Sequence, residues 1–386
     1  MQSDPSLNRT QKLQVATGAG VVAVAYGMAR FGLGLSTPRI IEDQVATEAQ
    51  IGIASSLSFT TYVIACFISG ALLNKSRWKA SILLVLATAV VGCLLVATAV
   101  NAPMFLAGIG IGGAAAGFTS GAIAYRLVRD LPTPVEPRSQ ALANAGAGIG
   151  VALATALLLF TTSWRSVFLA AAVLAVVLCL GFIRTSRGVT AQRFRDETPG
   201  APGRLVVPVL LTMLMGAGSS VYWTYGRALV EEQAKLSAQQ SLLFWGAIGV
   251  SGVAGSFSGD AATKLGTKIS WAACSVLLGA SILLLPFLSG IALIVISGAV
   301  FGAFYTILCG LTIELARESW PTAVGAATSI LFATIAVGQA VGSLLNGLMA
   351  TVAGFPVLFV VGGVSAMVGC ALVWVVPSRQ AALQGT

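Results

Sequence analysis

The sequence contains no histidine and few charged residues of either sign. Of its 386 residues, 13 are acidic and 22 are basic, and charged residues make up 9% of the total. All the acidic residues fall in loops, tails or the ends of apolar runs, so the sequence shows no buried proton carrier. Hydrolases and metalloenzymes need metal ligands, or a nucleophile with a base. We therefore expect no enzyme activity, no metal and no cofactor.

The six cysteines are not placed to form a metal site or a disulfide. Each lies in a different apolar run, and none belongs to a CxxC motif. They are Cys66, Cys93, Cys179, Cys274, Cys309 and Cys370. We interpret them as small apolar residues that pack between helices.

Long apolar runs dominate what the sequence does contain. Hydrophobic residues make up 56% of the chain and its mean hydropathy is +0.90, which excludes a soluble domain of this size. A bilayer core about 30 Å thick needs about 20 apolar residues per helix. Twelve runs meet this need: 13–38, 51–73, 80–100, 103–125, 139–160, 165–183, 205–229, 239–258, 269–287, 290–313, 322–350 and 355–376. We expect an all-α integral membrane protein with twelve transmembrane helices.

The basic residues predict the orientation of these helices. Lysine and arginine stay on the cytoplasmic side of a membrane, whereas acidic residues count little. With both termini cytoplasmic, only Arg39, Arg165, Arg227 and Lys235 of the assigned basic residues lie outside. The sequence thus predicts a multi-pass protein of the cytoplasmic membrane. Its net charge of +9 is explained by topology and anionic lipid, without a nucleic-acid partner.

The runs fall into two groups of six around one polar connection. We predict an N-terminal bundle at 1–183, a cytoplasmic linker at 184–204 and a C-terminal bundle with a short tail at 205–386. The linker is rich in Arg, Thr, Gly and Pro. The first and seventh runs echo one another, as GAGVVAVAYGMAR and GAGSSVYWTYGRA. Such internal repeats are typical of secondary transporters, which hold their substrate near the midplane between the repeats.

Two inner loops carry a resemblance to a known family. Residues 70–79, GALLNKSRWK, resemble the loop signature of the major facilitator superfamily (MFS), and residues 255–268 form a stretched version of it. The resemblance extends to WRSVF at 164–168 and implies an MFS fold of two pseudo-symmetric six-helix bundles. It also implies alternating access around a central cavity, lined by spans 1, 2, 4, 5, 7, 8, 10 and 11. Gly27-x-x-Arg30-Phe31, with Pro38 closing the span, resembles the YbfB/YjiJ-like branch.

The same loops supply candidate gating residues. The resemblance implies that an acid and several bases lock the inward side shut, which assigns this role to Lys75, Arg77, Lys79, Asp260 and Lys268. Asn74 stands where the family has Asp, so only a hydrogen bond from its amide remains there. Glu314 and Asp260 sit at inner helix ends near Arg317 and Lys264, which also suits gating.

Arg30 is the leading candidate for a substrate contact. It lies past the middle of the first apolar run, where burying a guanidinium costs roughly 3 kcal/mol or more, and such residues usually face a protein interior or a water-filled path. A guanidinium is a planar fork of donors suited to carboxylate or phosphate. A structural role, satisfying helix carbonyls or a neighbouring Tyr or Asn, stays equally open. Arg227 is the echoed candidate on span 7, with snorkelling to the outer interface as the favoured alternative.

Polar residues within the spans are further candidates for the substrate site. Tyr26 lies one turn before Arg30, on a similar face of the helix. The remaining candidates are Tyr62, Tyr222, Tyr225, Tyr305, Gln339 and Asn346. A tyrosine in mid-helix needs a partner for its hydroxyl, and either a substrate or a neighbouring helix can supply one. Ordinary interhelical hydrogen bonding is the favoured interpretation for Tyr62, Tyr305, Gln339 and Asn346.

We hypothesise facilitated or exchange transport of a small organic anion by a monomer. A multidrug efflux carrier is an alternative, because Gly146, Gly148 and Gly150 resemble the glycine-rich fifth helix of drug-proton antiporters. The Gly-Pro pair of that antiporter motif is missing, which weakens this alternative. A channel or a non-transport membrane protein is a third class, but the sequence shows no selectivity filter.

Overall fold

The computed structural model describes residues 7–132, 135–161, 163–186, 205–321 and 323–376. These residues form helices and no strand. The predicted linker at 184–204 lies outside the described residues from position 187 onward. Most of the short C-terminal tail and the first six residues lie outside them as well. The linker and the cytoplasmic position of both termini therefore stay predictions.

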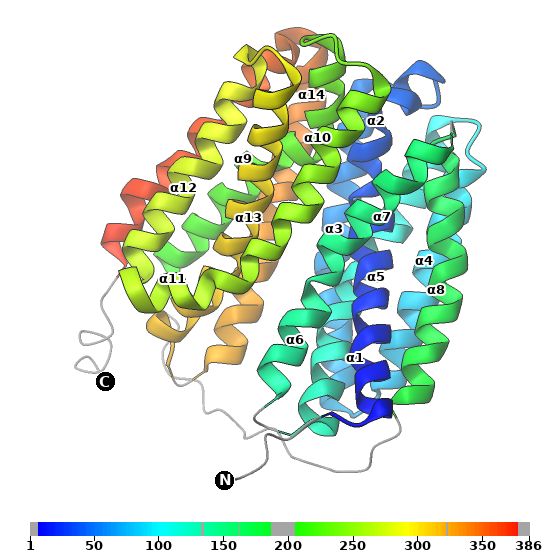
Figure 1. Ribbon diagram of the computed structural model, residues 1–386, viewed down its shortest axis with the longest axis vertical. Helices are drawn as coiled ribbons and strands as arrows, with labels where there is room; N and C mark the ends of the chain where they lie inside the picture. Colours follow the sequence, from blue (N-terminus) through cyan, green and yellow to red (C-terminus); the bar gives the residue numbers. More distant parts are fainter. Residues whose placement is uncertain (1–6, 133–134, 162, 187–204, 322, 377–386) are drawn as a thin grey trace. The chain divides into compact units, whose positions relative to one another are not determined.

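Two compact units divide the chain (Figure 1). Unit 1 consists of Met1–Ala46 and Leu57–Phe194, and unit 2 consists of Thr47–Ser56 and Arg195–Thr386. The described helices of unit 1 are α1 (Arg9–Val22), the π-helical segment η1 (Ala23–Arg30), α2 (Gly32–Glu42), α3 (Glu48–Asn74), α4 (Trp78–Ala97), α5 (Ala102–Asp130), α6 (Glu136–Asn144), α7 (Gly146–Phe160) and α8 (Arg165–Thr185). The first residues of α3 belong to unit 2.

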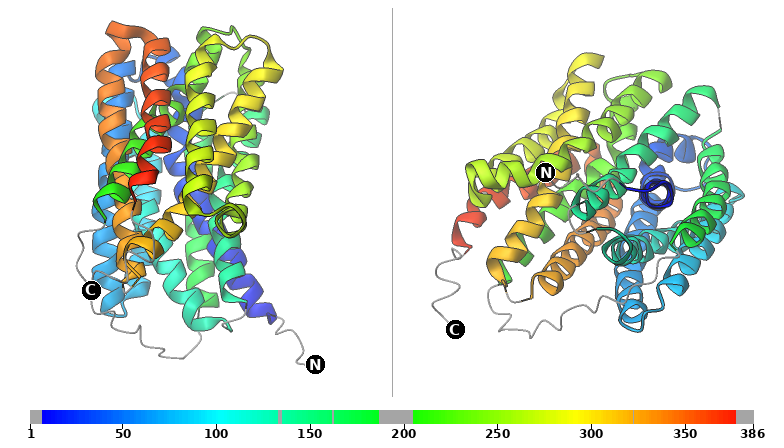
Figure 2. Two further views of the ribbon diagram at one scale, coloured as in Figure 1. Left: turned by 90° about the vertical axis from the view of Figure 1, so that its left-hand side faces the viewer. Right: turned by 60° about the horizontal axis from the view of Figure 1, so that its bottom comes forward.

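Unit 2 contains the remaining helices, which Figure 2 shows from two further sides. They are α9 (Val206–Glu232), α10 (Ala238–Ser251), the 3₁₀ turn η3 (Gly252–Phe257), α11 (Ser258–Leu265), α12 (Thr267–Leu284), η4 (Leu285–Phe287), α13 (Ile291–Ser319), α14 (Val324–Leu372) and η5 (Val373–Val375). Asp260 and Lys264 lie on the short helix α11, beyond the end of the predicted run 239–258.

Eleven helices in the described part of the chain are long and apolar enough to cross a membrane. The last of them spans Val324–Val375 and is broken at Gly354, whose φ of 72° is strained for residues with a side chain. The predicted runs 322–350 and 355–376 lie on either side of this break. The predicted all-α architecture of membrane-length helices is thus present in the described residues.

The first membrane span is not the single regular helix that the sequence predicts. It runs over Arg9–Glu42 and passes from α1 through η1 into α2. In η1 the helix widens, and the amide of Phe31 donates to the carbonyl of Tyr26, five residues back, at 2.9 Å. The prediction that Pro38 closes the span is wrong, because α2 contains this proline and continues to Glu42.

Glycines on α7 allow this span to pack at backbone distance. A Cβ added to Gly146 would lie 2.1 Å from the carbonyl oxygen of Ala19, and one added to Gly150 would lie 2.0 Å from that of Ala23. On the other side, a Cβ on Gly27 would lie 2.4 Å from the Cα of Gly150. Small residues allow such close approach in a membrane, where dispersion contacts drive helix association. The contact fixes η1 against α7.

We expect Gly150→Ala to destabilise unit 1. The new methyl group would meet the backbone of η1, which cannot move aside as a flexible side chain can, and such overpacking costs about 1 to 3 kcal/mol. Gly70→Ala is the matched control, since no atom lies within 4 Å of a Cβ built on Gly70. Unfolding of the purified variants by denaturing detergent measures the effect. Equal stability of the Gly150 and Gly70 variants would contradict the close contact.

The loop after α2 is tied to the start of α8. The indole nitrogen of Trp164 donates to Asp43 Oδ2 at 2.8 Å, and Arg165 Nη1 donates to the same oxygen at 3.0 Å. Arg165 also donates to the carbonyl of Ala99 at 3.1 Å. The Trp164 indole, followed by Arg165, lowers the pKa of the Asp43 carboxyl. Two residues of the WRSVF motif thus hold the end of the first span in unit 1.

This lowered pKa gives the tie a defined pH dependence. The Asp43 carboxylate stabilises the fold above its unfolded-state pKa of about 3.9, and the contribution is lost as the pH falls through the lower folded-state pKa. Because the side chain is 45% exposed, the effect is about 1 kcal/mol or less. The melting temperatures of the wild type and Asp43→Asn are expected to differ at about pH 7 and to converge below about pH 3. A constant difference across this range would refute the assignment.

Candidate functional site

Arg30 is buried within unit 1 at the end of the π-helical segment. Its side chain is 7% exposed. π-helical turns inside α-helices occur frequently at functional sites. A buried guanidinium at this depth in a span needs electrostatic compensation from its surroundings.

Four aromatic rings surround the Arg30 guanidinium. Its Cζ atom lies 4.2 Å from the ring centre of Tyr62 and 4.4 Å from that of Phe59. The rings of Tyr26 and Phe31 are each 5.7 Å away. We call Tyr26, Phe31, Phe59 and Tyr62 the aromatic cage. A cation over aromatic faces gains about 0.5 to 2 kcal/mol per ring, more when water is excluded. Aromatic rings attract the guanidinium through its charge, whereas a carboxylate would also accept hydrogen bonds from its N–H groups.

A chain of hydroxyl groups adjoins the cage. The Tyr26 hydroxyl donates to that of Tyr62 at 3.3 Å and lies 2.9 Å from the Ser120 hydroxyl on α5. The two tyrosine rings meet edge to face with their centres 6.0 Å apart. Hydroxyl groups and apolar ring surface therefore both lie close to the cation. This arrangement suits an anionic group attached to an apolar body.

The structure brings together three residues that the sequence singles out, Tyr26, Arg30 and Tyr62. It adds Phe59 and Ser120, which were not predicted from the sequence, and Phe31, which entered there only as part of the branch motif and not as a site residue. Phe59 and Tyr62 are three residues apart on α3, a spacing that puts side chains on one helix face. That spacing was the available signal for Phe59. Ser120 gives no such signal, because it comes from a helix far along the chain.

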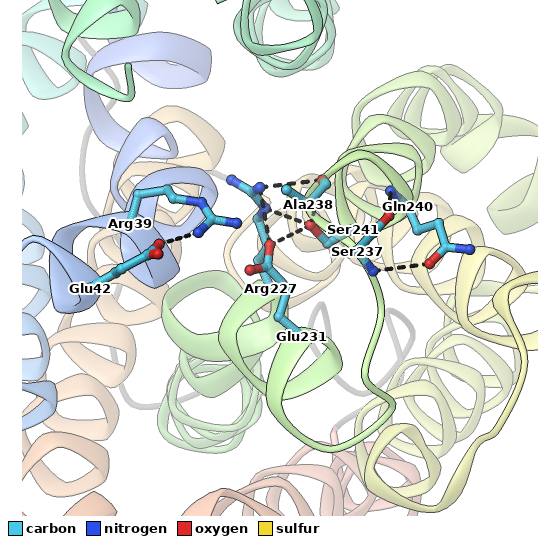
Figure 3. A network of polar contacts seen from close by, with 8 residues as sticks. All are labelled: Arg39, Glu42, Arg227, Glu231, Ser237, Ala238, Gln240 and Ser241. Atoms are coloured by element: carbon cyan, nitrogen blue, oxygen red, sulfur yellow. Dashed lines mark hydrogen bonds and ion pairs between the residues drawn. The ribbon is translucent and has the colours of Figure 1, made fainter. Parts of the chain in front are cut away.

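Arg227 lies in a separate network in unit 2 (Figure 3). Its Nε donates to the Ser241 hydroxyl at 2.9 Å, and its Nη2 lies 3.0 Å from Glu231 Oε1 and 3.4 Å from the carbonyl of Ala238. The Ser241 hydroxyl donates to Glu231 in turn. The predicted snorkelling is wrong, since the side chain is only 2% exposed. The network accounts for the burial of Arg227 by itself, and its role in substrate binding stays a prediction.

The other polar candidates of unit 2 have partners within that unit. The Tyr222 hydroxyl lies 3.0 Å from that of Ser297, and the Tyr225 hydroxyl donates to the carbonyl of Glu48 at 2.6 Å. Gln339 donates to the Tyr305 hydroxyl at 3.1 Å, and Asn346 donates to Ser220 at 3.0 Å. Interhelical hydrogen bonds thus occupy these groups, and their contact with a substrate stays a prediction.

Aromatic rings form a stacked column in unit 2. The rings of Tyr222 and Phe301 are nearly parallel with centres 3.9 Å apart, and Tyr305 continues the column 5.8 Å from Phe301. Trp223 packs edge-on against Phe301 and Tyr305, at 5.2 and 5.4 Å. Such geometry stabilises the packing of α9 against α13 by about 0.5 to 1.5 kcal/mol per pair beyond the burial of ring surface.

The candidate gating residues of unit 1 lie at the surface. Asn74, Lys75, Arg77 and Lys79 are all exposed, whereas Trp78 between them is buried. The Trp78 ring lies 4.6 Å from the guanidinium carbon of Arg126, which pairs with Asp130 at 2.6 Å. This pair, with its side chains 8% and 4% exposed, was missed by the sequence analysis.

The Arg126–Asp130 pair joins several helices at the end of α5. Gln14 on α1 donates to Asp130 Oδ2 at 2.6 Å and to the Ser186 hydroxyl at 3.1 Å. Arg126 also donates to the carbonyl of Ser186 at 3.0 Å. Further hydrogen bonds of this kind help a buried ion pair to tolerate low dielectric. Asn74 stands where the resemblance places an acidic residue. The acid–base pair Arg126–Asp130 lies near this loop, because Arg126 contacts the Trp78 ring.

The candidate gating residues of unit 2 form few contacts with each other. Arg317 pairs with Glu314 at 2.9 Å, and the Arg317 side chain is 53% exposed. Lys268 Nζ donates to the carbonyl of Trp374 at 3.5 Å. Asp260 and Lys264 are exposed on α11. Within the described residues, no three His, Cys, Asp or Glu side chains gather where they could hold a metal ion.

Comparisons with known proteins agree with this architecture. The family described as "Uncharacterised MFS-type transporter YbfB" matches residues 22–375. No curated protein matches the chain in sequence. Among solved structures, a crystal structure of the nucleoside transporter NupG is similar with a TM-score of 0.75 and 14% sequence identity, over 95% of this chain and 99% of that chain. At this identity the likeness shows the fold.

Proposed function

Because this chain belongs to the family of the MFS-type transporter YbfB, we propose that its cargo is a small organic anion. Family membership makes the chain a multi-pass membrane protein and a transporter. In this proposal the protein is a carrier of the cytoplasmic membrane that works by alternating access as a monomer. The Arg30 guanidinium contacts the anionic group of the cargo.

The aromatic cage around Arg30 is the observation that supports this proposal. A permanent cation is buried in mid-span, at the end of a π-helical segment, with aromatic rings at 4.2 and 4.4 Å from its Cζ. Buried cations within membrane spans are costly, and they commonly mark the path of a substrate or ion. The rings stabilise the guanidinium through their quadrupoles and carry no negative charge of their own, so they leave its positive charge to attract an anion.

A thermal-shift screen of the purified full-length protein tests the cargo class. The panel contains organic acids, amino acids, sugars, nucleosides and lipophilic cations. We expect organic acids to raise the melting temperature, since a ligand that binds the folded state at about 100 times its Kd stabilises it by about 2.7 kcal/mol. Stabilisation by lipophilic cations alone would favour the drug-efflux alternative and overturn the anion proposal.

Counterflow in proteoliposomes tests the carrier mechanism. A carrier loaded with unlabelled solute accelerates the entry of labelled solute, because each turnover exchanges one molecule for another. A channel shows no such acceleration. We expect counterflow for the solute that the screen identifies, with no requirement for a pH gradient. Uptake that needs a pH gradient and is abolished by replacing one carboxylate would contradict facilitated or exchange transport.

A nucleoside is a second candidate cargo. NupG, the similar structure, is a nucleoside transporter, and unit 2 contains the stacked column of Tyr222, Phe301 and Tyr305 with the Gln339 amide at its end. Aromatic stacking and an amide are the groups that recognise a nucleobase. Uridine and adenosine belong in the same screen. Their stabilisation of the protein, unchanged by Arg30→Gln, would favour this candidate.

A further inference from the structure

We infer that the anion accepted at Arg30 is a monocarboxylate without an ammonium group, and that the Phe59 ring helps to select it. The inference rests on the proposed function, because it specifies the cargo of the same site. Three features of unit 1 support it: where its carboxylates are engaged, where its other cations lie, and what surrounds the Arg30 guanidinium.

The carboxylates of unit 1 are engaged away from the cage. Its four described acidic residues are Glu42, Asp43, Asp130 and Glu136. They contact, in that order, Arg39, the Trp164–Arg165 pair, Arg126 and Gln140. An ammonium group next to the cage would lie close to the Arg30 cation, which repels it and already occupies the nearest ring faces, and it would meet no described carboxylate of that unit. An amino acid is consequently a poorer match for this site than the acid that lacks the amino group.

The other cations of unit 1 lie at helix ends. Among its described residues, Arg30 is the basic side chain in the middle of a span, and the remaining arginines and lysines lie near helix ends or in loops. Arg126, four residues before the end of α5, is also buried and is paired with Asp130. A dianion such as a phosphate monoester or a dicarboxylate would bring a second negative charge without a second mid-span cation in this unit. Uncompensated charge at this depth is costly. One cation thus matches one negative charge.

The cage itself matches a planar anion joined to an apolar body. A guanidinium presents its donors in one plane, the geometry of a two-oxygen carboxylate. Phe59 contributes ring surface alone and is 3% exposed, whereas Tyr62 contributes ring surface and a hydroxyl. Removing the Phe59 ring therefore takes away attraction for the cation and contact for the hydrocarbon. Removing the Tyr62 hydroxyl leaves both in place.

Two sets of matched compounds test the class. Phenylpropionate, phenylalanine and phenylsuccinate share one body, and they differ by an added ammonium or an added carboxylate. Butyrate, aminobutyrate and succinate form an aliphatic set of four-carbon acids, in which succinate carries a carboxylate in place of the methyl group of butyrate. Native Cys66, one turn after Tyr62 on α3 and partly exposed, reports binding through its rate of alkylation, read by peptide mass spectrometry on the full-length protein. Cys370 in unit 2 is the internal control.

We expect the monocarboxylate of at least one set to slow the alkylation of Cys66, and its ammonium and dicarboxylate counterparts to need about tenfold higher concentration or more for the same protection. Phe59→Leu is expected to raise the protective concentration about tenfold. Tyr62→Phe, which keeps the ring, is expected to change it less. Only variants that elute as a single symmetric peak in size-exclusion chromatography, as the wild type does, are compared. This criterion excludes misfolded protein from the measurement.

The outcomes separate this inference from the proposed function. Equal protection by phenylalanine and phenylpropionate, or stronger protection by succinate than by butyrate, would overturn the monocarboxylate class, while an anion contact at Arg30 would stand. An unchanged protective concentration in Phe59→Leu would overturn the role of that ring. If no anion protects Cys66, or if Arg30→Gln and Arg30→Lys are protected as the wild type is, the proposed function fails as well.

Discussion

Arg30→Gln is expected to abolish transport of an anionic cargo while the protein still folds. Glutamine is a shorter side chain that remains polar, but it lacks the charge and the planar fork of donors. Truncating one partner of a buried, hydrogen-bonded charge pair costs about 2 to 5 kcal/mol, which is a factor of about thirty or more in affinity. Binding by thermal shift and counterflow in proteoliposomes measure the loss.

Two control variants show whether the loss in Arg30→Gln comes from substrate binding. Arg30→Lys keeps the charge without the fork and is expected to retain part of the binding. Arg39→Gln removes an arginine of unit 1 whose side chain is 32% exposed and which pairs with Glu42, so it is expected to leave binding unchanged. A structural role for Arg30 predicts the opposite pattern, namely lower stability of Arg30→Gln with normal transport in the protein that folds.

Asp130→Asn is expected to lower the free energy of unfolding by about 3 kcal/mol or more. The substitution preserves the shape of the side chain but leaves the buried charge of Arg126 without its counterion. It also weakens the bonds through which Gln14 joins α1 to this end of α5. Unfolding by denaturing detergent, followed by circular dichroism, measures the change.

The exposed pair in unit 2 is the matched control for this prediction. Glu314→Gln also removes the acid of an i to i+3 or i+4 arginine pair, but the Arg317 side chain is 53% exposed. Solvent screens such a pair, so its loss is expected to cost about 1 kcal/mol or less. Equal effects of the two substitutions would contradict the buried character of the Arg126–Asp130 pair.

The sequence was sufficient for the fold because the physics of the bilayer is local. Each run such as 80–100 must bury about 20 apolar residues, whatever surrounds it. Helical spacing likewise related Tyr26 to Arg30, since both lie on one span. These expectations need no knowledge of which helices touch, and the all-helical membrane class follows from them. The MFS fold itself was implied by the resemblance of the two inner loops.

What the sequence could not supply are the contacts between distant segments. Ser120 and Phe59 join Arg30 only through the packing of α5 and α3 beside η1. In the sequence, Asp130 is an ordinary acidic residue near a helix end. In the structure, Gln14 and Arg126 both donate hydrogen bonds to its carboxylate. The regular helix expected for 13–38 failed for a related reason, because tertiary packing against glycines such as Gly150 accompanies a backbone geometry that apolar periodicity does not encode.

The π-helical segment determines which changes of length the first span tolerates. A π turn is equivalent to an α-helix that carries one inserted residue. Side chains before and after η1 are therefore out of phase by about 100°, the angular step of one α-helical residue. Deleting a single residue such as Ala25 would restore a uniform helix and rotate Arg30 by that angle relative to α1, away from Phe59 and Tyr62. Conservation of chain length between Ala23 and Arg30 is thus a requirement for holding the cation among its rings.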